Sequence, residues 1–210
     1  MPSADTKFQV LHDHYKESFA YIREREKQRD HLFLILVALF GLLAFEVLYP
    51  TALIQALPAI GVPVVNAEVD VRHLPMAVIL STTWVFVLAI LLRYGKVTIT
   101  IERQYAYLHK LEEKISNIIG DAEVYRREGR DYEKDYPLFS SWVWRFYTVL
   151  FPALILYATI ILIGTEWKTL DTSTHSKVVD SLLALGVLIS ISLYRIVPVV
   201  REWLSSDERE

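Results

Sequence analysis

Apolar residues gather in four stretches of the chain, and polar residues separate them. Residues 74–92 and 146–164 each run for nineteen positions without a charged side chain, which corresponds to about 28 Å of α-helix. The hydrocarbon core of a bilayer is about 30 Å thick, so each stretch is long enough to cross it. Both are predicted to be membrane-spanning helices.

The other two apolar stretches each carry charge near an end. Residues 32–49 are uncharged except for Glu46, and a basic cluster precedes them. Residues 178–200 contain Asp180 and Arg195, and a long arginine side chain near a helix end can reach the membrane surface. With these two, the pattern predicts an all-α integral membrane protein with four transmembrane helices.

Lysine and arginine are distributed unevenly between the segments that join the spans. Six lie within residues 1–30, ten within residues 93–145 and three from residue 195 onward, and the remaining segments contain only three. Cytoplasmic segments of membrane proteins carry an excess of these residues. The N-terminus, the central segment and the C-terminus are therefore predicted to be cytoplasmic, in a multi-pass protein of a bacterial inner membrane.

Helical periodicity continues outside the spans. In residues 1–30, apolar side chains recur every three or four positions, as on one face of an amphipathic helix. After the second span, apolar residues recur at heptad spacing, and this assembly stripe consists of Ile101, Leu108, Leu111, Ile115 and Ile118. The two segments are predicted to be cytosolic helical extensions of spans one and two that pair antiparallel, with Gly120 ending the longer helix. The same stripe could instead join the subunits of a homo-oligomer or bind a cytosolic partner.

These patterns divide the chain into five predicted parts. The first is a cytosolic amphipathic helix, the second and fourth are transmembrane hairpins, the third is a cytosolic helix with a connector, and the fifth is a cytosolic tail. Within the fourth part, the stretch from Thr165 to Asp180 is predicted to be a short polar loop on the outer side. The boundaries of the five parts are, in order, residues 1–30, 31–94, 95–141, 142–200 and 201–210.

The composition restricts the chemistry that the chain can perform. There is no cysteine, which excludes disulfides, thiolate metal sites and cysteine nucleophiles. The net charge of −3 gives no reason to expect a nucleic-acid partner. The histidines follow no spacing typical of a metal site, and no acid, base and nucleophile form a known motif. We therefore expect no catalytic residues, no cofactor and no metal, and the lipid bilayer is the first partner.

Glu46 is the one acidic residue well inside a predicted span. Ionisable residues within the membrane often mark ion or proton paths. The alternative is that Glu46 lies just below the outer interface, wetted or hydrogen-bonded to hydroxyl groups of another helix. Its candidate neighbours, in an ion path or a polar site, are Ser81, Thr82 and Thr83 of the second span.

A basic group in the central connector could bind an anionic lipid headgroup or a phosphorylated ligand. It consists of Arg126, Arg127 and Arg130. Acidic residues alternate with these arginines and weaken their field, so ordinary positive-inside charge explains them as well.

The layout of residues 8–119 is a cytosolic amphipathic helix, a helical membrane hairpin and a charged cytosolic helix. This order is similar to that of the SLATT proteins, small membrane effectors of bacterial defence systems. The second pair of spans departs from that layout.

Three functions fit these features unequally. The first is a non-enzymatic anchor, scaffold or sensor that acts by assembling with itself or with a cytosolic partner, as the heptads suggest. The second is an oligomeric channel or membrane-permeabilising effector, in which the cytosolic helices receive the trigger. A membrane enzyme acting on a lipid-linked substrate would need converging catalytic side chains, which the sequence does not supply.

Overall fold

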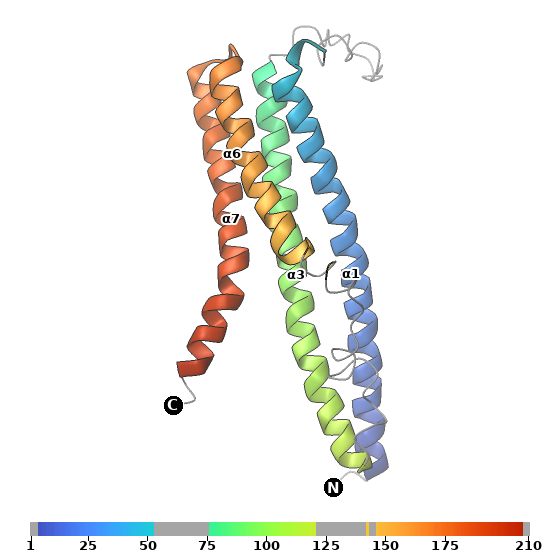
Figure 1. The fold of residues 1–210 in the computed structure, drawn as a ribbon. Coiled ribbons are helices and arrows are strands. Elements are labelled where there is room, and N and C mark those ends of the chain that lie inside the picture. Colours follow the sequence, from blue (N-terminus) through green and yellow to red (C-terminus); the bar gives the residue numbers. More distant parts are fainter. Residues whose placement is uncertain (1–3, 53–75, 121–141, 143–145, 208–210) are drawn as a thin grey trace, which may run out of the picture. The chain divides into compact units, whose positions relative to one another are not determined.

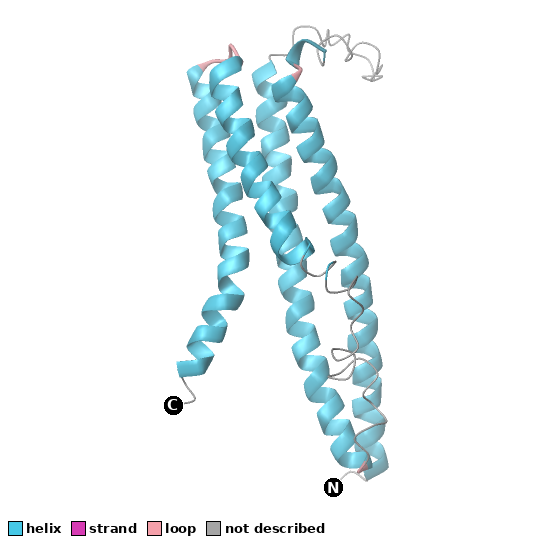
Figure 2. Ribbon diagram, viewed as in Figure 1, coloured by secondary structure: helices cyan, strands magenta, loops and turns pink. Residues whose placement is uncertain are grey.

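The structure is a computed structural model, which describes residues 4–52, 76–120, 142 and 146–207. Among these residues there is no strand (Figures 1 and 2). The elements are α1 (Ala4–Leu48), α3 (Met76–Ile119), the π-helical turn η3 (Phe146–Leu150), α6 (Phe151–Thr169) and α7 (Thr174–Asp207). Helices α1, α3, α6 and α7 are all long and apolar enough to cross a membrane, so the predicted all-α protein with four such helices is confirmed.

Helices α6 and α7 are longer than the spans predicted for this part of the chain. Residues 165–180 were expected to form a polar loop, but only residues 170–173 are non-helical. Polar residues continue the helices because their hydroxyl groups bond locally: Thr165 donates to the carbonyl of Ile161 over 2.8 Å. At the start of α7, Ser173 acts as an N-cap, and its Oγ accepts the backbone N–H of Ser176 over 3.3 Å.

A π-helical turn precedes α6. Pro152 lies in the first turn of α6 and has no backbone N–H, and its ring crowds the carbonyl four residues earlier. The wider turn at Phe146–Leu150 is the local consequence of that proline.

The chain divides into two compact units, and α1 and α3 contribute residues to both. The hairpin unit consists of Met1–His31 and Lys96–Phe151, and the membrane unit of Leu32–Gly95 and Pro152–Glu210. Each unit is described separately below.

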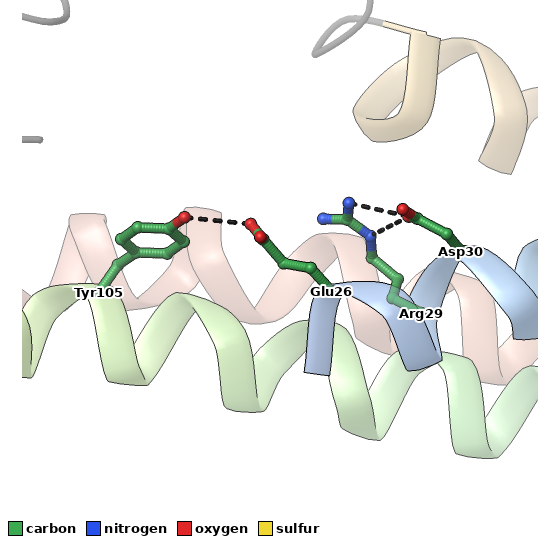
Figure 3. A network of polar contacts seen from close by, with 4 residues as sticks. All are labelled: Glu26, Arg29, Asp30 and Tyr105. Carbon is green, nitrogen blue, oxygen red and sulfur yellow. Dashed lines mark hydrogen bonds and ion pairs between the residues drawn. The ribbon is translucent and has the colours of Figure 1, made fainter. Parts of the chain in front are cut away.

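In the hairpin unit, the first part of α1 packs against the last part of α3. Tyr15 of α1 donates a hydrogen bond to Glu112 of α3 over 3.3 Å, and Tyr105 of α3 donates to Glu26 of α1 over 3.0 Å (Figure 3). The α3 partner moves back along the chain as the α1 partner moves forward, so the two segments run antiparallel. Their buried apolar residues include Ile22, Val97, Ile101, Leu108, Leu111 and Ile115.

The predicted end of α3 at Gly120 is confirmed. The helix stops at Ile119, and Gly120 has a φ of 73°, in the left-handed region that glycine enters without a side-chain clash. Its N–H donates to the carbonyl of Ser116 over 3.0 Å, which satisfies one of the last free carbonyls of the helix.

The membrane unit is apolar on its outside and contains polar side chains in its core. Large apolar side chains such as Leu34, Tyr157 and Leu182 are more than half exposed. The buried polar side chains of this unit include Glu46, Thr83, Thr159, Glu166 and Asp180. A water-soluble helix bundle has the opposite arrangement, with its apolar face turned inward. The outer surface of the unit is therefore suited to lipid.

Glycine permits a close approach of α7 to α3. A Cβ added to Gly186 would lie 3.1 Å from Cδ2 of Leu88, so only a hydrogen atom fits there without displacement. A small residue at such a contact lets two membrane helices pack closely. Gly41, which the sequence also offered as a contact point on α1, has open space where its side chain would be.

Candidate functional site

Glu46 is fully buried, on the face of α1 that packs inside the membrane unit. Leu43 and Val47 lie on the same face, three residues before it and one residue after it. Thr83 of α3 donates a hydrogen bond from its Oγ1 to Oε1 of Glu46 over 2.8 Å. The same Oγ1 lies 3.1 Å from the carbonyl oxygen of Ile79. Glu46 is therefore a hydrogen-bonded residue of the core, joined to a second helix.

The structure separates the three hydroxyl residues that the sequence grouped with Glu46. Thr83 is its partner, whereas Thr82 is exposed and donates to the carbonyl of Val78 in its own helix over 2.7 Å. Ser81 is half-buried, and its hydroxyl group interacts with the carboxyl group of Asp180 on α7. One hydroxyl thus meets Glu46, one meets a second acidic residue, and one faces away.

Two more carboxyl groups lie in the same core, and the sequence analysis did not connect them with Glu46. Glu166 of α6 and Asp180 of α7 are both fully buried and interact with each other. The charge of Asp180 also reaches Glu46. We call Glu46, Glu166 and Asp180 the carboxyl cluster.

A signal for Glu166 was present in the sequence. It lies four residues after Leu162 and four before Leu170, and all three are buried on one face of α6. Asp180 precedes the buried Ala184 by four residues in the same way. Both were missed because this segment was assigned to a loop, where such periodicity has no meaning.

The indole group of Trp84 faces the carboxyl cluster. Trp84 is fully buried on α3, next to Thr83, and its ring N–H is directed at Glu166. By strict hydrogen-bond geometry, Nε1 of Trp84 and both carboxyl oxygens of Glu166 and of Asp180 have no partner among the described residues. Buried polar atoms are rarely left so, since each costs about 1–3 kcal/mol.

The one cation whose charge reaches the cluster lies at its edge. Lys177, half-buried on α7, interacts electrostatically with Glu166. Its Nζ lies 3.5 Å from the carbonyl oxygen of Trp167 and 5.9 Å from the centre of that tryptophan ring. Among the described residues, no Lys, Arg or His is buried. The three carboxyl groups therefore have no basic partner in the core.

The described part of the chain contains no group of three or more His, Cys, Asp or Glu side chains arranged to hold a metal ion. The carboxyl groups of the cluster interact, but they do not converge on one point as ligands of a single ion must.

Two other sets of residues were singled out by the sequence. Arg126, Arg127 and Arg130 lie outside the described residues. The assembly stripe lies in the hairpin unit, where Ile118 is 41% exposed next to the end of α3, and the other four members are buried: Ile101, Leu108, Leu111 and Ile115.

Comparison of the chain with protein-family models, with curated proteins and with solved structures finds no match.

Proposed function

We propose that this chain is a non-enzymatic multi-pass membrane protein that acts as an anchor, scaffold or sensor, by assembling with itself or with a cytosolic protein. One observation carries the proposal: α1 and α3 each run without a break, over 45 and 44 residues, from the membrane unit into the hairpin unit. A helix that is continuous between two units can hold one in place through the other. The uneven distribution of lysine and arginine supports placing the hairpin unit and both termini in the cytoplasm.

The surface available for assembly is the outside of the hairpin unit. Most of the assembly stripe is already buried within one chain, so the exposed apolar side chains are the better candidates. Val10 and Tyr21 on α1 are exposed and eleven residues apart, as are Tyr107 and Ile118 on α3. Eleven residues are about three helical turns, so each pair lies on one face of its helix.

The mass of the full chain in lipid nanodiscs tests this proposal. We expect a particle with more than one copy of the chain, and replacing Tyr107 and Ile118 by serine should shift it toward a single copy. Replacing the exposed Lys110 and Lys114 by serine is the matched control and should leave the mass unchanged. A single copy at every protein concentration, without a bound partner, would contradict assembly.

The carboxyl cluster favours a second candidate, an oligomeric channel or membrane-permeabilising effector. Acidic side chains in a membrane core commonly line the path of a cation or a proton. Liposomes that contain the purified chain should then show ion or proton flux, and Glu46→Gln should alter it. Absence of flux from liposomes in which the oligomer has been verified would leave the scaffold proposal in place and remove the channel.

A further inference from the structure

The carboxyl cluster poses a problem of charge. If Glu46, Glu166 and Asp180 were all ionised, three negative charges would lie in a core that includes no buried basic residue among those described. Lys177 supplies one positive charge at the edge. Burying an uncompensated carboxylate costs several kcal/mol even after relaxation, on the order of the whole stability of many proteins. Something besides the described side chains has to compensate the remaining charge.

The hydroxyl group of Thr83 shows what compensates Glu46. Its oxygen lies 2.8 Å from Oε1 of Glu46 and 3.1 Å from the carbonyl oxygen of Ile79, and both of these atoms are acceptors when Glu46 is ionised. A threonine has one hydroxyl hydrogen and can serve only one of them well. If Glu46 carries a proton, its own O–H donates to Thr83, and Thr83 donates to Ile79. All three groups are then satisfied.

Glu166 and Asp180 lead to the same conclusion by a different route. Ionised carboxylates only accept hydrogen bonds, so two that face each other repel and share no hydrogen. When one of them is protonated, its O–H donates to the other. The N–H of Trp84 faces Glu166, and the hydroxyl of Ser81 faces Asp180, so each side of such a pair also has one neutral donor.

We propose that the carboxyl cluster is a proton-binding site, which holds one proton on Glu46 and a second between Glu166 and Asp180. The cluster then retains one negative charge, which the single charge of Lys177 balances. The other groups that face it, Ser81, Thr83 and Trp84, are neutral donors. Protons fit better than a metal ion because the carboxyl groups do not converge as ligands. The proposal holds whether the chain is a scaffold or a channel.

Infrared spectroscopy of the full chain in nanodiscs tests this site, because a protonated carboxyl group has a carbonyl band that a carboxylate lacks. At neutral pH we expect the wild-type chain to show this band, which should fall in Glu46→Gln, in Glu166→Gln and in Asp180→Asn. Glu113→Gln changes an exposed carboxyl group and should leave the band unaltered. Absence of the band at neutral pH, or an equal band in all these variants, would overturn the proposal.

Two further measurements protect the test from misfolding and from a different ligand. Carbon-13 labelling of aspartate in the wild-type chain should shift part of the band, which locates a shared proton on Asp180 without any substitution. Thr83→Val should move the band of Glu46, whereas Thr82→Val should not, because only Thr83 contacts Glu46. If Na⁺ or Ca²⁺ at constant pH removes the acid band and raises the unfolding temperature, the site binds a cation and the proton assignment is wrong.

Discussion

Tyr105 donates a hydrogen bond to Glu26 over 3.0 Å and thereby joins α3 to α1 in the hairpin unit (Figure 3). The bond between Tyr15 and Glu112 joins the same helices with the roles exchanged, since here α1 supplies the tyrosine. Two such bonds, eleven residues apart on α1 and seven apart on α3, fix the register of the antiparallel pair. The packed apolar residues alone would specify that register less strictly.

Removing the Tyr105 hydroxyl should therefore loosen the hairpin unit. A hydrogen bond to a charged acceptor contributes about 1.5–3 kcal/mol, and we expect Tyr105→Phe to lose the lower end of this range because the pair is only partly buried. The loss should appear as faster hydrogen exchange in residues 4–31. Tyr107→Phe, at an exposed tyrosine on the same helix, is the control and should exchange like the wild type. If Tyr105→Phe also exchanges like the wild type, the bond does not hold the register.

The buried part of the assembly stripe should be far more sensitive to truncation than its exposed end. Leu108 is fully buried, and Leu108→Ala should cost about 2–5 kcal/mol of local stability. Ile118→Ala removes a similar amount of side chain from an exposed position and should cost little. Limited proteolysis of the nanodisc-bound chain compares the two, and equal protection of both variants would show that the stripe is not a packing surface.

The hydroxyl groups of Thr83 and Thr82 should differ in their contribution to stability. Thr83→Val leaves the buried Oε1 of Glu46 without its donor, which we expect to cost about 1–3 kcal/mol. Thr82→Val removes an exposed hydroxyl that bonds only within its own helix and should be neutral or slightly stabilising in lipid. Thermal unfolding followed by circular dichroism measures the difference. Identical unfolding temperatures would mean that Glu46 does not depend on Thr83.

Gly186 should tolerate no large side chain. Gly186→Leu would place atoms where Leu88 already lies, and overpacking of this kind typically costs about 1–3 kcal/mol. Leu88→Ala in the same chain should recover part of the loss by making room. Gly41→Leu is the matched control, since the space beside Gly41 is open. Equal unfolding temperatures for the two single variants would contradict close packing of α7 on α3.

The proposed orientation predicts where reporter fusions will be active. Fusions after Lys27, between Glu112 and Lys134 and after Glu208 should report the cytoplasm, because these segments carry most of the lysine and arginine. Fusions near Asp70 and Thr172 should report the opposite side. A cytoplasmic signal at Thr172 would be incompatible with α6 and α7 both crossing the membrane.

The sequence by itself determined the four long apolar helices, the stop of α3 at Gly120 and the presence of an acidic residue within an apolar segment. Each of these depends on residues close together in the chain: the length of an apolar run, the conformational freedom of one glycine, and the position of Glu46 in its run. Such local features need no knowledge of which helices are neighbours.

Only the tertiary structure decided which polar residues meet. Thr82 and Thr83 are adjacent in sequence, but one residue turns a helix by about 100°, so one points outward and the other reaches Glu46. Glu166 and Asp180 lie more than a hundred residues after Glu46, and no pattern within α6 or α7 names a partner on α1. The carboxyl cluster exists because the packing of four helices buries those three faces together, and packing between distant segments is not encoded in the period of any one of them.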